Sequence, residues 1–136
     1  MRDLKTLKAC DVMVRPVVSA RLNASSRDVA LQFLSGLYSG MPITDDEGKV
    51  VGVVSELDLL NAVVEGRELA KLTAEELMSK DPVTADVETP VTDIVKLMKE
   101  KNVIRLPITS EGKLVGVVAR CDILTSIIEP EFVTYM

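Results

Sequence analysis

The chain alternates between two patterns of apolar positions. The continuous β-branched run at 50–54 is typical of a buried strand, whereas Val29, Phe33 and Leu37 recur at the spacing of one helix face. The patterns predict, in order, a strand at 17–18, a helix opened by Ser25 and Ser26, strands at 42–44 and 50–54 around a turn at 45–48, and a helix from Ser55 to about 65–66.

The same order of patterns returns in the second half of the chain. Thr73 and Glu76 form a capping-box pattern, which predicts a short helix. After it we expect a strand at 83–84, a helix starting at Pro90, strands at 107–109 and 114–118, and a last helix over 121–128 that Pro130 ends. The tail 131–136 is expected to lie loose or against a partner chain. The pattern therefore predicts the α+β class.

Aligning the two halves reveals a direct repeat. Residues 48–60 read GKVVGVVSELDLL and residues 112–124 read GKLVGVVARCDIL, with eight of thirteen positions identical. Upstream, MPIT at 41–44 matches LPIT at 106–109. We expect two repeats, 1–66 and 67–136, that pack as a pseudo-two-fold symmetric pair, because neither small sheet can bury both faces alone. A seam between like halves is a natural place for a ligand.

Composition narrows the classes of function. Apolar residues make up 47% of the 136 residues and aromatic residues only 3%, so the core is predicted to be aliphatic. A net charge of −5 argues against general binding to nucleic acid or to an anionic membrane. The N-terminal residues lack the apolar run of a signal peptide, and no stretch approaches the length of a membrane span, so we expect a cytoplasmic protein.

Residue types that carry catalysis are scarce. The chain has no histidine, which removes the commonest general base and the commonest metal ligand. Its two cysteines, Cys10 and Cys121, are too few for a zinc cluster and are expected to be small buried apolar residues. We therefore predict no enzyme activity, no catalytic residues and no metal site.

The segment with the most chemical content is Ser55-Glu56-Leu57-Asp58, where an apolar strand meets a helix. In one interpretation it is a helix cap, with Asp58 complementing the helix dipole. In the other, the carboxylate of Asp58 accepts both hydroxyls of a ribose, as acidic residues do in dinucleotide-binding folds. The strand glycines Gly52 and Gly116 are expected to let a neighbouring backbone or a ligand approach closely.

The joint pattern, present twice, resembles the cystathionine-β-synthase (CBS) domain family. Over 12–60 and 77–124, an apolar-Pro-apolar-Thr strand is followed by Gly-x-Val and then by an Asp four residues further on, which is part of Ser-x-x-Asp in the first copy. The resemblance implies a pair of β-α-β-β-α repeats with two clefts between them, which in many members bind AMP, ADP, ATP, S-adenosylmethionine or NAD. An adenosine nucleotide is then expected as a regulatory ligand, AMP, ADP or ATP first, with no cofactor required.

The resemblance also implies residues for each cleft. In one cleft a carboxylate would hold the ribose, a strand would line the base, and backbone groups of the other repeat would read the adenine edge. The first cleft would use Ser55, Asp58, Met41, Pro42, Ile43, Val83 and Thr84, and the second Asp122, Leu106, Pro107, Ile108, Val17 and Val18.

The copies differ at the junction. Ala119 replaces the serine, so the second cleft lacks one hydroxyl, while Arg105 and Arg120 stand where the first copy has Gly40 and Glu56. Guanidinium groups pair with phosphate in a fork geometry, so both arginines are candidate phosphate contacts; otherwise they are solvated or form surface ion pairs. The clefts are therefore expected to be unequal.

Two non-catalytic functions remain open. The chain is a sensor of an adenosine compound, or it is a ligand-free module for dimerisation or protein interaction. A homodimer is expected, with a possible unidentified effector protein. The helix faces Val29-Phe33-Leu37 and Ile94-Leu97-Met98 are candidates for the dimer contact or, equally, for the chain's own core.

Overall fold

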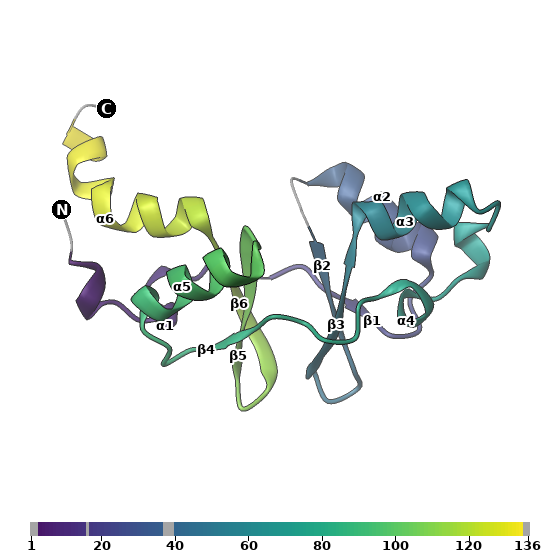
Figure 1. Ribbon diagram of the computed structural model, residues 1–136, viewed down its shortest axis with the longest axis horizontal. Helices are drawn as coiled ribbons and strands as arrows, with labels where there is room; N and C mark the ends of the chain where they lie inside the picture. The colour runs from purple at the N-terminus through teal and green to yellow at the C-terminus, as the bar shows by residue number, and fades with distance from the viewer. Residues whose placement is uncertain (1–2, 16, 37–39, 135–136) are drawn as a thin grey trace. The chain divides into compact units, whose positions relative to one another are not determined.

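The computed structural model describes residues 3–15, 17–36 and 40–134. Helices and strands are interspersed along the chain (Figure 1). In order they are the 3₁₀ helix η1 (Leu4–Thr6), α1 (Ala9–Val12), β1 (Ala20–Arg21), α2 (Ser26–Ser35), β2 (Gly40–Thr44), β3 (Val50–Ser55), α3 (Glu56–Val64), the 3₁₀ helix η2 (Leu69–Lys71), α4 (Ala74–Leu77), β4 (Ala85–Asp86), α5 (Val91–Lys101), β5 (Arg105–Ser110), β6 (Lys113–Ala119) and α6 (Arg120–Thr134).

The chain divides into two compact units. The first unit is residues 18–82, and the second unit is residues 83–136 together with 1–17. The first contains β1-α2-β2-β3-α3 and the second β4-α5-β5-β6-α6, which is the same order of elements. The predicted α+β class and the repeated β-α-β-β-α unit are confirmed.

Each unit has one three-stranded sheet, β1-β2-β3 or β4-β5-β6, with a parallel and then an antiparallel pair. The parallel pairs begin with Ala20 opposite Ile43 and with Ala85 opposite Ile108. The strands predicted at 17–18 and 83–84 were therefore wrong by two to three residues. A strand exists where a neighbour accepts its backbone hydrogen bonds, and the β-branched residues alone do not specify that place.

Aliphatic side chains fill a separate core in each unit. In the first unit, Met41 and Ile43 of β2 pack with Val29 and Phe33 of α2. We call the segments 4–14 and 69–79, which precede the first strand of each sequence repeat, the lead-ins. In the second unit, residues at matching positions and residues of the first lead-in form the core: Leu7, Ala9, Val12, Ala85, Val91, Ile94, Met98, Leu106, Ile108, Val118 and Ile123. Most of the two candidate dimer faces thus lies in these cores, with Leu97 packed against the second; Leu37 lies outside the described residues.

Each lead-in packs in the compact unit that holds the strands of the other sequence repeat. Ala74 N donates to Ala24 O at 2.8 Å in the first unit, and Ala9 N donates to Thr89 O at 2.8 Å in the second. These two contacts differ by 65 residues at both ends, so the same attachment is made twice. The compact units therefore cut across the sequence repeats.

The exchanged lead-ins also pair with the last strand of each sheet. Val53 N donates to Ser79 O at 3.1 Å, and Val14 N donates to Val117 O at 2.8 Å. Gly52 permits this approach, because a Cβ there would lie 2.7 Å from Ser79 O. The predicted close approach is confirmed for Gly52, where the backbone of Ser79 approaches; at Gly116 the approaching group is the side chain of Met13 rather than the predicted backbone or ligand.

One ion pair ties the N-terminal lead-in to the second unit. Lys8 Nζ lies 2.7 Å from Glu88 Oε2, and both side chains are more than half exposed. The hydrogen bond and charge of Glu88 raise the pKa of Lys8 above its ordinary value. The pair therefore favours the attached lead-in wherever Glu88 is ionised and Lys8 keeps its proton.

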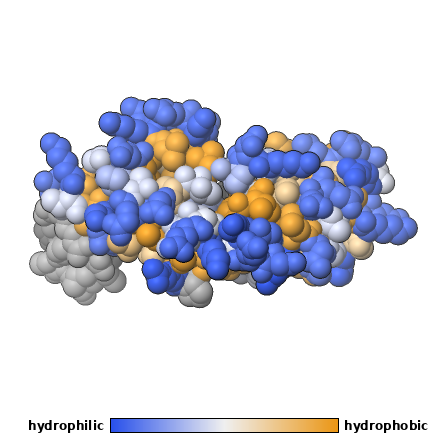
Figure 2. Space-filling model, turned by 90° about the horizontal axis from the view of Figure 1, so that it is seen from below, coloured by the Kyte–Doolittle hydropathy of each residue, from blue (hydrophilic) through white to orange (hydrophobic). Residues whose placement is uncertain are grey.

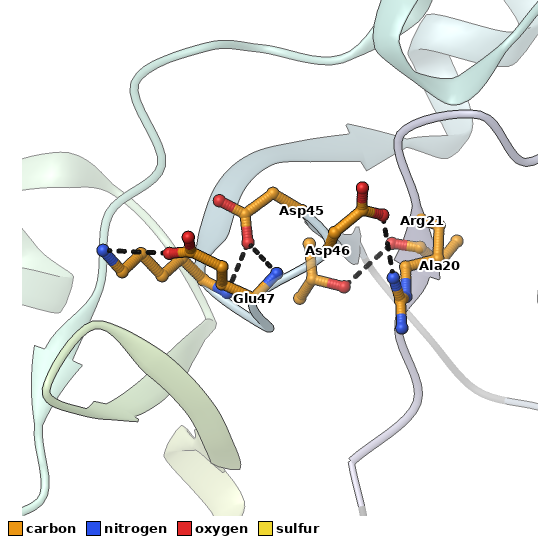
Figure 3. A network of polar contacts seen from close by, with 7 residues as sticks. Ala20, Arg21, Asp45, Asp46 and Glu47 are labelled. Atoms are coloured by element: carbon orange, nitrogen blue, oxygen red, sulfur yellow. Dashed lines mark hydrogen bonds and ion pairs between the residues drawn. The ribbon is translucent and has the colours of Figure 1, made fainter.

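The turn between β2 and β3 is closed by polar contacts (Figure 3). Asp45 Oδ1 accepts from Glu47 N at 2.9 Å and from Lys49 N at 3.0 Å, which satisfies two turn donors. Arg21 Nη1 lies 3.1 Å from Asp46 Oδ1 and links β1 to this turn. The predicted turn is confirmed.

Two further sequence predictions were wrong. Helix α6 continues past Pro130 to Thr134, so the predicted tail at 131–134 is helical backbone. A proline removes only its own donor, here the one that the carbonyl of Ser126 would accept, and this helix accommodates that loss. Cys10 and Cys121 are both exposed, because each stands in the first turns of a helix on the side away from the core.

Candidate functional site

The junction of β3 and α3 holds Asp58 in a defined orientation. Ser55 N donates to Asp58 Oδ2 at 2.8 Å, and Asp58 N donates to Ser55 Oγ at 3.1 Å. This reciprocal pair is a complete capping box, so the helix-cap interpretation of the motif is correct as far as it goes. The box uses Oδ2 of the half-buried carboxylate, and Oδ1 takes no part in it.

The equivalent junction of β6 and α6 keeps half of this arrangement. Ala119 N donates to Asp122 Oδ2 at 2.8 Å, so the carboxylate is anchored by the same oxygen as in the first unit. Alanine has no hydroxyl to accept from the helix N–H groups. The thiol Sγ of Cys121 lies 4.0 Å from Asp122 Oδ1. The two carboxylates therefore share their orientation and differ in their surroundings.

Antiparallel pairing brings the next strand beside each junction. Gly40 lies opposite Ser55 in the first unit, and Arg105 lies opposite Ala119 in the second. The strands predicted to line the base thus start next to the carboxylates predicted to hold the ribose. This neighbourhood follows from the hairpin and could be anticipated from the sequence.

Most side chains of β2 and β5 are buried within the two units. Met41 and Ile43 are fully buried in the core of the first unit, as are Leu106 and Ile108 in the second. Alternation along a strand puts the prolines between them on the other face of the sheet, where Pro42 and Pro107 are also buried. Contact of these residues with a ligand stays a prediction.

Arg120 is engaged within its own unit. Its Nε and Nη2 donate to the carbonyl oxygen of Val103 at 3.3 and 3.1 Å, although the side chain is exposed. Its backbone N–H donates to Ile104 O at 3.1 Å. This contact could not be predicted from the sequence, because the acceptors are backbone carbonyls. Arg105 is half-buried and also has an interaction partner.

The residues predicted to read the adenine edge lie in extended chain just before the first strand of each unit. Val17, Val18, Val83 and Thr84 are all half-buried and belong to no regular element. The boundaries between the compact units fall beside them, at 17–18 and 82–83.

Two further properties concern the described part of the chain. Within it, no three His, Cys, Asp or Glu side chains gather into a group able to hold a metal ion. Nor does any helix in it combine the length and apolarity that crossing a membrane requires.

Comparison with known proteins identifies the family. The model of the CBS domain matches residues 9–65 and 74–129, so this chain belongs to the CBS domain family and carries two such domains. A CBS domain-containing protein of Dictyostelium discoideum is 31% identical over 136 residues, which cover 87% of this chain and 92% of that protein. The chain spans 22–66% of the length of four relatives from Methanopyrus kandleri and Methanocaldococcus jannaschii.

Solved structures show the same fold. The CBS domain pair of protein MJ0100, in complex with 5′-methylthioadenosine and S-adenosyl-L-methionine, superposes with a TM-score of 0.75 at 25% identity, covering 89% of this chain and 99% of that one. CBSX2 in complex with AMP superposes with a TM-score of 0.77 at 23% identity, covering 91% and 98%. The identification of a tandem CBS pair is confirmed.

Proposed function

We propose that this chain is a non-catalytic regulatory module that binds an adenosine-containing ligand through Asp58 and, more weakly, through Asp122. The observation that carries the proposal is the repeated junction, in which Oδ2 of each carboxylate is anchored by the N–H three residues earlier. A carboxylate held by one oxygen keeps a fixed orientation for the hydroxyls of a ribose. Adenosine compounds bound to the CBS pair of MJ0100 and to CBSX2 support the ligand class.

The first junction is the stronger candidate. Its capping box is complete, and Ser55 Oγ stays beside the carboxylate. At the second junction, Arg105 and Arg120 supply positive charge and remain the candidates for phosphate contacts. AMP, ADP and ATP are accordingly our first choices of ligand, followed by S-adenosylmethionine and NAD.

The mechanism we propose is a population shift. The chain leaves one unit and enters the other at 17–18 and at 82–83. The residues proposed to bind the adenine edge lie at these two connections. A ligand that binds their backbone groups acts on the covalent connections themselves. It changes the arrangement of the chain only in proportion to its difference in affinity for the alternatives.

The direct test is substitution of one atom in the ribose carboxylate. Asp58→Asn keeps an oxygen for the N–H of Ser55 but removes the charge, so we expect ligand affinity to fall roughly tenfold or more, the worth of a hydrogen bond to a charged group. Isothermal titration calorimetry with AMP measures it. Glu56→Gln, an exposed neighbour in the same turn, is the matched control. Equal affinities in wild type and Asp58→Asn place the ligand elsewhere.

A second candidate function is protein interaction, and one surface favours it. Six large apolar side chains of α2 and α3 are 46–85% exposed. They form what we call the α2–α3 face: Leu31, Leu34, Leu57, Leu60, Val63 and Val64. In the view from below, apolar residues also reach the surface among polar ones (Figure 2). We propose that this face, rather than the stripes buried in the cores, makes a homodimer.

The second unit provides an internal comparison for this proposal. Lys96 and Lys99 stand at the positions of Leu31 and Leu34, and both lysines are exposed. The same fold therefore forms with charged residues at these places. The leucines of the first unit are not needed to build the helix, and a second copy of the chain would bury them.

A further inference from the structure

Several hydrogen bonds hold the loop 102–104 between α5 and β5. Asn102 ends α5 in the left-handed conformation at φ +52°, and its N–H donates to Met98 O. Val103 N also donates to Met98 O, at 3.1 Å. This double contact ends the helix and turns the chain sharply.

Arg120 donates hydrogen bonds to the carbonyl oxygens of Val103 and Ile104. The guanidinium edge formed by Nε and Nη2 donates to Val103 O at 3.3 and 3.1 Å, and the backbone N–H donates to Ile104 O at 3.1 Å. One residue of α6 thus binds two successive carbonyls of the loop. The Nη1 group takes no part in this contact, and a charged donor makes it stronger than a neutral pair.

The loop and Arg120 border the two halves of the second candidate site. Strand β5 starts at Arg105, directly after Ile104, and leads into the predicted base-lining residues. Asp122, the predicted ribose carboxylate, stands two residues after Arg120 in the first turn of α6. A contact between loop 102–104 and Arg120 therefore fixes the start of β5 against the start of α6.

The side chain at the equivalent position of the first copy cannot donate in the same way. Glu56 occupies the position of Arg120, and an ionised carboxylate only accepts hydrogen bonds. The first junction has instead the serine hydroxyl that Ala119 lacks. The two copies thus stabilise equivalent junctions by different means.

We propose that Arg120 is a positioning residue: it ties loop 102–104 to the first turn of α6 and so sets the spacing between β5 and Asp122 in the second site. The consequence for ligands rests on the proposed function. A positioning residue contributes to the binding of adenosine and AMP alike, whereas a residue that acts only as a phosphate contact contributes to AMP alone.

The first arm of the test needs no ligand. Hydrogen exchange at the amides of residues 103 and 120 is compared in wild type, Arg120→Met and Arg120→Lys, with Lys101→Met as a control for loss of a nearby positive charge. We expect exchange to accelerate about tenfold in Arg120→Met, as fits loss of a charge-assisted hydrogen bond. Arg120→Lys should recover part of the protection, because its ammonium can still donate to Val103 O. Unchanged exchange in Arg120→Met overturns the proposal.

The second arm measures affinity for adenosine and for AMP in an Asp58→Asn background, which weakens the first site. We expect Arg120→Met to weaken both ligands by the same factor, of about tenfold, and Arg120→Lys to restore part of both. Loss of AMP affinity with unchanged adenosine affinity overturns the positioning role. If neither ligand binds even the wild-type chain, the proposed function fails, and the exchange arm still decides whether the loop contact holds.

Discussion

At the scale of single residues, the two copies act as each other's controls. Ser26 and Ser126 have buried hydroxyls without a hydrogen-bond partner among the described residues. The equivalent positions are Val91 and Ala62, both buried and apolar. The fold therefore accepts an apolar side chain at either place, and a buried hydroxyl without a partner costs free energy.

Ser126→Ala and Ser26→Ala should each raise the free energy of unfolding by about 1 kcal/mol, because each removes an unpaired polar group. Thermal unfolding should show a melting temperature about 3 °C higher for each variant. Ser35→Ala, which removes an exposed hydroxyl bonded to Gln32 O, is the comparison and should change stability little. A lower melting temperature for Ser126→Ala contradicts the assignment of an unpaired hydroxyl.

At the scale of elements, each sheet depends on a lead-in that approaches a glycine. The atoms nearest Gly52 include the backbone oxygen of Ser79. The atoms nearest Gly116 all belong to the side chain of Met13. A methionine side chain can change its conformation, but the backbone of a paired segment can move only with loss of hydrogen bonds. The two glycines therefore differ in how far their sites can relax.

Gly52→Ala should lower the free energy of unfolding by about 2–3 kcal/mol, the upper range for overpacking a site. Gly116→Ala, its matched counterpart, should cost about 1 kcal/mol, because Met13 can yield. Urea denaturation of the two variants measures both costs. Equal costs, or a larger cost at Gly116, would falsify the claim that the backbone at Ser79 limits the first site.

The elements also show what the sequence could and could not predict. The order of elements, the capping box at Thr73 and the turn at 45–48 followed from local residues. The parallel strands were misplaced, because their bounds depend on distant partners in β2 and β5. The end of α6 was misplaced because proline weakens a helix without always ending it.

At the scale of the whole molecule, the repeat pattern could not predict that each lead-in packs with the strands of the other repeat. The alignment shows that segments 4–12 and 69–77 are equivalent, and not which sheet each one joins. The places of Asp58 and Asp122 at the strand–helix junctions were predictable, because each follows a strand within a short motif. The contact of Arg120 with Val103 O was not, since any residue supplies a backbone carbonyl.

The proposed dimer is also a property of the whole molecule. Full burial of a Leu or Val side chain is worth about 1.5–3 kcal/mol, so the α2–α3 face offers enough apolar surface to offset much of the cost of association. Analytical ultracentrifugation should show a dimer for wild type and a monomer for Leu31→Lys/Leu34→Lys. Leu124→Lys, an exposed leucine of α6, should stay dimeric. A monomeric wild type rules out this dimer.

The central claim is that an adenosine compound binds at the Asp58 junction, and thermal unfolding of the wild-type chain with AMP, ADP, ATP, S-adenosylmethionine and NADH tests it most directly. A ligand at 100 times its dissociation constant stabilises the folded chain by about 2.7 kcal/mol. We predict that at least one compound raises the melting temperature by about 8 °C, and that Asp58→Asn loses most of this rise. The absence of a shift with every compound would contradict the claim and favour the interaction module.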